Sequence, residues 1–309
     1  MGQTLEKRHY AAIDGLRTFA AVGIVLMHVL GNGKYALSGF VPEHMIPSCT
    51  NLVFLFMIIS GFAVCCGYHD KIINNKITLA QFYGKRFAKT WPFFALLCLV
   101  ELCISPSVGA LNEVFANLTL CHGLFTYHHT MSVIGVGWFL GVVFLFYLLF
   151  PFYAYLISDK KRAWFSFAVT LAFNLFCSDY FDLGRRNIMY CAVFFLAGGL
   201  IYLYREPLQK FSEKYRLLAF LPCVALTVVY YFFEGSSFIM LIVFSLYLIY
   251  AIGNTRTSIL NNPVTKFFSG ISMEVYLSHM MIYRILEKIG IVYIFGKGIL
   301  SYIAVCIAT

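Results

Sequence analysis

Charged residues are scarce in this chain. Only 12% of its 309 residues are Asp, Glu, Lys or Arg, whereas ordinary soluble domains contain about 25%. Hydrophobic residues make up 61%, above the usual fraction of about 45–50%. This composition excludes an ordinary soluble domain and indicates a polytopic membrane protein. Because each crossing takes about 20 residues, the chain has room for about ten transmembrane helices and for no separate soluble domain.

Several other signals are missing. No Cys-x-x-Cys pair or cysteine and histidine cluster has the spacing of zinc ligands, so we predict no metal site. Most of the ten cysteines lie inside apolar runs, where they act as small hydrophobic residues. The chain shows no internal repeat, low-complexity tract or interdomain linker, so we expect residues 1–309 to form a single membrane domain. We also expect no cleaved signal peptide.

The apolar runs predict an all-α fold, a polytopic bundle of about ten transmembrane helices. The net charge of +9 comes from 23 basic and 14 acidic residues. In a membrane protein such an excess reflects the positive-inside rule, so we expect membrane lipids and no nucleic acid as partners. The predicted spans are residues 14–32, 50–69, 91–107, 136–157, 163–181, 188–204, 216–234, 237–253, 267–287 and 289–309.

The stretch 112–125 decides the predicted topology. If it does not cross the membrane, sixteen of the 23 basic residues fall on the side of the N-terminus. If it crosses, the basic loop 159–162 falls outside, against the positive-inside rule. We therefore predict a re-entrant or interfacial segment at 112–125 and a multi-pass protein of a bacterial cytoplasmic membrane. Both termini are then cytoplasmic.

Arg17 and His28 are the most informative residues of the sequence. They lie eleven positions apart in one apolar run, so a helix turns both to the same side, about 16 Å apart along its axis. Ionisable groups inside a membrane span are costly and usually line a cavity or a substrate path. Spacing alone leaves the alternative open that Arg17 reaches the interface and that His28 is a packing histidine.

Arg17 and His28 belong to the first of four passages that combine polar or basic residues with apolar ones. The passages are Ile13-Asp14-Gly15-Leu16-Arg17 followed by His28, the phenylalanine-rich stretch ending in Ser60-Gly61-Phe62, the basic segment 82–92 with Arg86 and Lys89, and Tyr276-Leu277-Ser278-His279. In order and spacing they resemble the motifs of the acyltransferase-3 family of integral membrane acyltransferases. Together they extend over most of the chain, from about residue 14 to residue 279.

The chain departs from the family pattern at two positions. Lys89 stands where many members have a second arginine, so a bidentate grip on a phosphate is replaced by a point charge there. A Trp-x-Leu passage starting at Trp138 has Val143 where many members carry a glutamate. A second acidic catalytic group is therefore absent from that place.

The resemblance implies a membrane O-acyltransferase. It would move an acyl group, with acetyl the expected one, from cytoplasmic acetyl-CoA or another acyl-CoA to a hydroxyl of an envelope or surface carbohydrate. A carbohydrate or lipid-linked glycan would be the acceptor. His28, with an unperturbed pKa of about 6.5, suits a general base. Arg17 would bind the donor or stabilise oxyanion charge. Arg86 and Lys89 would bind the CoA phosphates, or instead contact anionic lipid.

Four further residues are expected to support this site, each with a structural alternative. Asp14 would orient Arg17 or cap the first helix. Ser60 would line the acyl path or pack against a helix, and Trp138 belongs to a motif passage. His279 would be a second polar group in the cavity or a packing residue. A transporter or flippase of a small or lipid-linked substrate is the alternative function, because polar residues in spans also mark substrate pathways.

Overall fold

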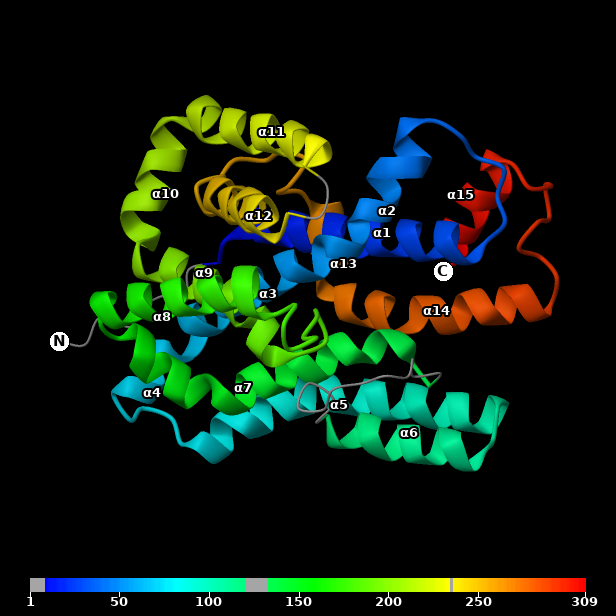
Figure 1. Cartoon of the computed structure of the whole chain (residues 1–309), viewed down its shortest axis with the longest axis horizontal. Coiled ribbons are helices and arrows are strands. Elements are labelled where there is room, and N and C mark those ends of the chain that lie inside the picture. The colour runs from blue at the N-terminus through cyan, green and yellow to red at the C-terminus, as the bar shows by residue number, and fades with distance from the viewer. Residues whose placement is uncertain (1–8, 121–132, 234–235) are drawn as a thin grey trace.

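The computed structural model describes residues 9–120, 133–233 and 236–309, and over these ranges it is helical, with turns and one isolated bridge (Figure 1). The all-α prediction is confirmed. The α-helices are α1 (Ala11–Asn32), α2 (Ile46–Ser48), α3 (Leu52–Val64), α4 (Asp70–Ile73), α5 (Leu79–Ile104), α6 (Val108–Thr119), α7 (Trp138–Ile157), α8 (Lys160–Ala172), α9 (Ile188–Leu203), α10 (Arg205–Lys214), α11 (Arg216–Phe232), α12 (Ser237–Ile252), α13 (Pro263–Gly270), α14 (Ser272–Lys288) and α15 (Ile299–Ala308).

Helices long and apolar enough to cross a membrane are concentrated in the N-terminal half. By length and composition, four stretches of the described chain meet this condition: Ala11–Asn32, Val41–Ile73, Leu79–Ile104 and Gly135–Ile157. Helices α9 and α10 meet it as a pair that bends by 76°, while α11, α12 and α15 are shorter apolar helices. These findings agree with a helical membrane protein, but they do not confirm ten crossings.

The predicted span 289–309 is wrong as a continuous helix. Only Ile299–Ala308 is helical in this region. Gly290 and Gly296 have φ angles of 77° and 81°, a left-handed conformation that interrupts a helix. The chain between α14 and α15 therefore forms a loop, in which the carbonyl of Lys297 accepts a hydrogen bond of 2.7 Å from the backbone of Ala36.

The predicted boundaries of two other spans are displaced. Helix α5 begins well before the predicted start at residue 91, because Thr78 forms a capping box with Gln81. The predicted span 267–287 is divided at Ile271 between α13 and α14, because α13 begins earlier on its own capping box at Asn262. Local side-chain caps thus override the apolar pattern at both places.

The stretch 112–125 was predicted not to cross the membrane. Residues 108–119 form α6, which packs beside α5 (Figure 1), and the indole of Trp91 donates a hydrogen bond of 3.0 Å to the carbonyl of Leu118. Twelve residues rise about 18 Å, which is less than the roughly 30 Å of the hydrocarbon core. The end of the predicted segment, 121–125, lies outside the described residues, so its topology stays a prediction.

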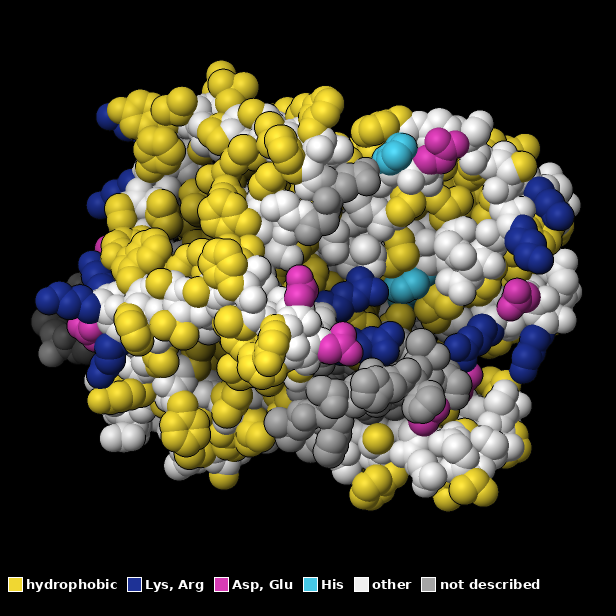
Figure 2. Space-filling view, viewed as in Figure 1, with side chains coloured by type: hydrophobic (Ala, Val, Ile, Leu, Met, Phe, Trp, Pro, Cys, Tyr) yellow, Lys and Arg dark blue, Asp and Glu magenta, His cyan; other side chains and the backbone are white. Residues whose placement is uncertain are grey.

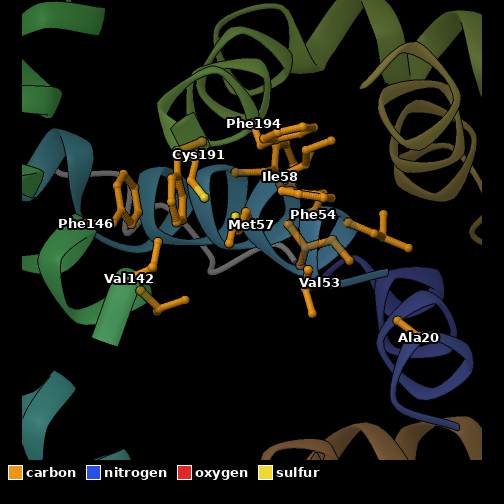
Figure 3. Close-up of a cluster of buried hydrophobic side chains, with 14 of the residues drawn as sticks. Ala20, Val53, Phe54, Met57, Ile58, Val142, Phe146, Cys191 and Phe194 are labelled. Carbon is orange, nitrogen blue, oxygen red and sulfur yellow. The ribbon is translucent and has the colours of Figure 1, made fainter. Parts of the chain in front are cut away.

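The core lies where α3 packs along α9. A Cβ atom on Gly61 would collide with the carbonyl oxygen of Phe195, so glycine lets the two backbones approach closely. Around this contact Phe54 stacks on Phe194 with ring centroids 4.3 Å apart, and Phe146 of α7 stacks on Phe195 at 4.1 Å. Figure 3 shows this cluster between α3, α7 and α9, with Ala20 of α1 at its edge.

Helix α1 runs through the middle of the fold and contacts α3, α12, α13, α14 and α15 (Figure 1). Its glycines permit this close packing, since a Cβ atom on Gly15 would collide with the backbone of Leu260. The hydroxyl of Thr18 donates a hydrogen bond of 2.8 Å to the carbonyl of Thr265 and so ties α1 to α13. These contacts fix the rotation of α1 about its axis, and with it the directions of Arg17 and His28.

Candidate functional site

His28 of α1 and His279 of α14 form a hydrogen-bonded pair. Nδ1 of His28 lies 3.0 Å from Nε2 of His279, and the ring centroids are 4.9 Å apart. His279 is fully buried, whereas His28 is half-buried. The packing of α14 along α1 thus joins residues from opposite ends of the sequence and leaves His28 the more accessible of the two.

The backbone of Tyr276 determines where the protons of this pair lie. Nδ1 of His279 is 2.7 Å from the carbonyl oxygen of Tyr276, which can only accept a hydrogen bond. Nδ1 of His279 must therefore carry a proton, and Nε2 of the neutral ring accepts. His28 then donates from its own Nδ1. In this tautomer Nε2 of His28 is unprotonated and can take up a proton, while the ring also has a hydrogen bond with the backbone of Ile24.

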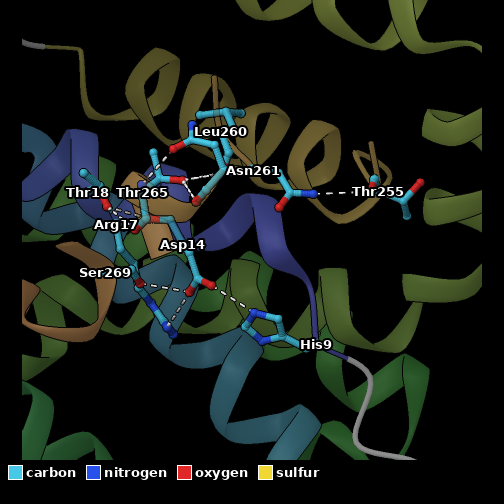
Figure 4. A network of polar contacts seen from close by, with 10 residues as sticks. His9, Asp14, Arg17, Thr18, Thr255, Leu260, Asn261, Thr265 and Ser269 are labelled. Carbon is cyan, nitrogen blue, oxygen red and sulfur yellow. Dashed lines mark hydrogen bonds and ion pairs between the residues drawn. The ribbon is translucent and has the colours of Figure 1, made fainter. Parts of the chain in front are cut away.

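Arg17 is held by a network of polar contacts around Asp14 (Figure 4). Oδ1 of Asp14 lies 3.9 Å from the guanidinium of Arg17 and accepts a hydrogen bond of 2.9 Å from the hydroxyl of Ser269. The other carboxylate oxygen lies 2.9 Å from Nε2 of His9. Helix α1 begins after Tyr10, so Asp14 is not its N-cap residue. The capping alternative is therefore wrong, and Asp14 contacts Arg17.

Arg17 lines a cavity of about 200 Å³ among α1, α3, α5, α7 and α14. Three other residues singled out in the sequence share this space: Ser60, Arg86 and Lys89. Its wall also includes Glu274, whose Oε2 is buried without a hydrogen-bond partner among the described residues. The cavity therefore combines cationic groups from two helices with one carboxylate.

Figure 2 shows one face of the molecule. Hydrophobic side chains dominate the left part of this face, and basic, acidic and histidine side chains gather near its middle. Charged groups inside a membrane protein usually face a cavity or a water-filled path. The gathering of polar groups therefore marks this part of the molecule as the candidate site.

Aromatic side chains hold Arg86 in place. Its guanidinium donates a hydrogen bond of 2.8 Å to the hydroxyl of Tyr68. It also lies over two aromatic rings, 4.7 Å from the centroid of Tyr68 and 5.8 Å from that of Tyr147. Such cation–π contacts keep the guanidinium in a fixed position. Lys89, one turn further along α5, is exposed at the same cavity.

The sequence left open whether Ser60 lines the acyl path or packs against a helix. In the structure Ser60 lines the cavity, and the neighbouring Gly61 packs against a helix. Gly61 faces α9 and permits the close helix packing described above. Ser60 faces the cavity together with Phe56 of the same helix. Adjacent residues of a helix point about 100° apart, so one can serve packing while the other lines the cavity.

Tyr276 stands between the cavity and the histidine pair. Its ring lines the cavity beside that of Phe139, with centroids 5.3 Å apart, while its carbonyl holds His279. The phenolic hydroxyl donates a hydrogen bond of 3.0 Å to the carbonyl of Val136. The spacing predicts that Arg17 and His28 point to the same side of α1, but His28 does not line this cavity. Tyr276 is the residue that contacts both the cavity and the histidine pair.

Arg185, which precedes α9, is a site residue that the sequence analysis did not single out. Its guanidinium interacts electrostatically with His28 and with Tyr276. It lies 5.5 Å from the ring centroid of Trp138 and donates a hydrogen bond to the hydroxyl of Thr50. Trp138 thus supports this arginine. The sequence feature that could have pointed to Arg185 is its position, because it is one of the few basic residues that lie outside the predicted cytoplasmic loops.

Glu101 and Glu274, two of the carboxylates inside the predicted spans, have different surroundings. Glu101 forms an ion pair of 2.6 Å with Arg284, which ties α5 to α14. Glu274 instead lines the cavity. Val143, the position where the family resemblance led us to note a missing glutamate, lines the same cavity. The cavity therefore receives its carboxylate from α14 and not from α7.

A comparison with protein families gives one match. Residues 10–309 match the model of the acyltransferase-3 family, which is described as an acyltransferase domain. Comparisons with curated proteins and with solved structures gave no match. The match extends over nearly the whole chain and includes all four motif passages and both histidines of the pair. The chain therefore belongs to the acyltransferase-3 family and is an acyltransferase.

Proposed function

We propose that this protein transfers an acyl group, expected to be acetyl, from acyl-CoA to a hydroxyl of an envelope or surface carbohydrate. The observation that carries the proposal is the hydrogen-bonded chain from the Tyr276 carbonyl through His279 to His28. It leaves a basic nitrogen on the half-buried histidine. A base oriented by a second group is the usual arrangement for activating a hydroxyl.

In this proposal the reaction is a direct transfer. Nε2 of His28 takes the proton of the acceptor hydroxyl while its oxygen attacks the carbonyl carbon of the thioester. When the carbon–sulfur bond breaks, His28 returns the proton to the leaving thiolate of CoA. The products are an O-acyl ester and free CoA. Arg185, which interacts electrostatically with His28, would stabilise negative charge on the oxyanion.

The cavity at Arg17 is proposed to hold the donor. CoA carries several phosphate charges, and Arg86 and Lys89 offer cationic groups at this cavity together with Arg17. The acyl end of the donor would then point past the ring of Tyr276 toward His28. The acceptor would reach His28 from outside this cavity, since His28 is half-buried and does not line the cavity.

Kinetic measurements test this division of roles. We expect Arg86→Gln to raise the KM for acetyl-CoA with a smaller loss at saturating donor, because it removes a phosphate contact that does not change during the reaction. Lys214→Gln, a change of a basic residue that lies outside the cavity, is the control. An unchanged KM in Arg86→Gln would contradict donor binding at this cavity.

Arg17 is expected to respond differently to substitution. Asp14 orients Arg17, so we expect Arg17 to hold the donor in its reactive position. Arg17→Gln should then lower kcat, and Arg17→Lys should stay impaired because lysine lacks the planar guanidinium. Identical kinetic defects in Arg17→Gln and Arg86→Gln would contradict separate roles for the two arginines. Full activity of Arg17→Lys would show that charge alone is sufficient at this position.

We further propose ten crossings of a bacterial cytoplasmic membrane, with both termini cytoplasmic. The support is the sixteen basic residues that this topology gathers on one side. We expect Lys161→Cys to be shielded from an impermeant thiol reagent in intact cells and Lys34→Cys to react, each compared with the unaltered chain. Both should react in lysed cells. Reaction of both cysteines in intact cells would mean that residues 112–125 cross the membrane, and the reverse pattern would contradict cytoplasmic termini.

Mass spectrometry of surface carbohydrates tests the proposed substrate. Cells that produce the protein should carry an O-acetyl mass increment of about 42 Da on a glycan, and cells that lack it, or that produce His28→Ala, should not. A transporter or flippase, the other function considered from the sequence, is set aside by the acyltransferase match. An increment that does not depend on His28 would contradict the proposal.

A further inference from the structure

A second cavity, larger than the one at Arg17, lies along another face of α1. Its volume is about 480 Å³, and we call it the lateral groove. On α1 it is lined by residues such as Phe19 and Gly23. These point roughly 120–160° away from Arg17 on a helix of about 100° per residue. The lateral groove is therefore separate from the candidate active site.

The walls of the lateral groove are mostly apolar, and its length matches one leaflet of a membrane. Helix α12 lines it with Met240, Val243, Phe244, Tyr247 and Tyr250, which form one helical face. The ten positions from the first to the last of these residues rise about 15 Å. This is half of the roughly 30 Å of a bilayer's hydrocarbon core, the depth that one acyl chain occupies.

Polar groups without a full set of partners lie at one end of the lateral groove. Nε of Arg216 donates a hydrogen bond of 3.3 Å to the hydroxyl of Tyr250, and no ion pair involves Arg216 within the described ranges. Asn254 is only 4% exposed, and its amide nitrogen donates to Ser258 at 3.0 Å. Its Oδ1 is buried without a hydrogen-bond partner in the described chain. A buried acceptor of this kind normally has a donor.

The hydroxyls elsewhere along the lateral groove are paired with one another. Ser48 and Tyr231 lie 3.2 Å apart, oxygen to oxygen, and Thr227 and Tyr247 lie 3.1 Å apart. The unmet hydrogen-bonding capacity is therefore at the end with Arg216 and Asn254. A ligand that fits must combine an apolar chain with a charged, hydrogen-bonding head.

We propose that the lateral groove binds one glycerophospholipid. One of its acyl chains lies along α12, and its phosphate contacts the guanidinium of Arg216. The bound lipid would pack against α1 on the side away from Arg17 and would form part of the wall that holds this helix.

Native mass spectrometry of the detergent-purified full chain tests this site. After delipidation, the unaltered protein should bind one phosphatidylethanolamine. Arg216→Gln should bind it about fivefold more weakly, the effect of losing one cationic contact near a membrane surface. Lys214→Gln is the matched control, since this exposed lysine ends α10 two residues before Arg216 and lies outside the lateral groove. Equal affinity of the two variants would overturn the proposal.

A second comparison needs no variant and so does not depend on how well Arg216→Gln folds. Diacylglycerol has the acyl chains but no phosphate, and we expect the unaltered protein to bind it at least about fivefold more weakly than phosphatidylethanolamine. A photoreactive phosphatidylethanolamine with a diazirine on its acyl chain should label residues of α12 that line the lateral groove. Equal binding of both lipids would overturn the proposal, and so would labelling of residues outside the lateral groove. Crosslinking that shows a second copy of the chain in the lateral groove, in place of the lipid, would also overturn it.

Discussion

Replacing His28 with alanine is expected to lower the rate of acyl transfer by about 10²–10⁴-fold, the usual contribution of a general base. The physical reason is that Nε2 of His28 is the proton acceptor left by the hydrogen-bonded chain through His279. The rate of CoA release from acetyl-CoA, measured with the purified variant, checks this result. The variant should still accumulate in the membrane, because His28 is only half-buried.

His44→Ala is the matched control for this experiment. His44 is an exposed histidine that follows α1, and its ring stacks on that of Phe40. Its variant should retain nearly the full rate. Near-normal transfer by a well-folded His28→Ala protein would remove His28 from the mechanism.

The second large effect is expected at His279, which acts on the reaction through His28. When His28 takes up a proton, its Nδ1–H becomes a charge-assisted donor to Nε2 of His279. Such hydrogen bonds contribute about 1.5–3 kcal/mol, so His279→Ala should lower kcat by about 10–100-fold. His279→Gln keeps a side-chain oxygen that can accept from His28, and it should be less impaired.

The double variant separates this positioning role from a general loss of packing. If His279 acts through His28, then His28→Ala combined with His279→Ala should be no slower than His28→Ala alone. Ser278→Ala changes the neighbouring residue of α14 and should have little effect. Independent losses that multiply in the double variant would contradict a shared chain of hydrogen bonds.

The sequence predicted the class of fold better than its details. Apolar composition and the long run that contains Arg17 were sufficient to predict a helical membrane protein with α1 as a span. The predicted span 289–309 was wrong because its apolar residues are interrupted by Gly290 and Gly296 in left-handed conformations. Hydropathy averages over such positions, whereas helix boundaries depend on single residues, as the capping box at Thr78 also shows.

The candidate site was only partly predictable for a related reason. The motifs singled out His28 and His279 separately, but their hydrogen bond depends on the packing of α14 along α1. Arg185 gave no motif signal, and it reaches the site only because the chain before α9 passes Trp138. Periodicity indicates which face of a helix a residue occupies. Which faces meet is decided by tertiary contacts.

The most direct test of the central claim is the fate of labelled acetyl-CoA in membrane vesicles that contain this protein and the native glycans. With ¹⁴C in the acetyl group, we predict that label enters an alkali-labile ester of the carbohydrate fraction and that an equal amount of free CoA appears. His28→Ala vesicles should show neither product. Label in the carbohydrate of His28→Ala vesicles, or the absence of any labelled ester with the unaltered protein, would contradict acyl transfer by the His28 and His279 pair.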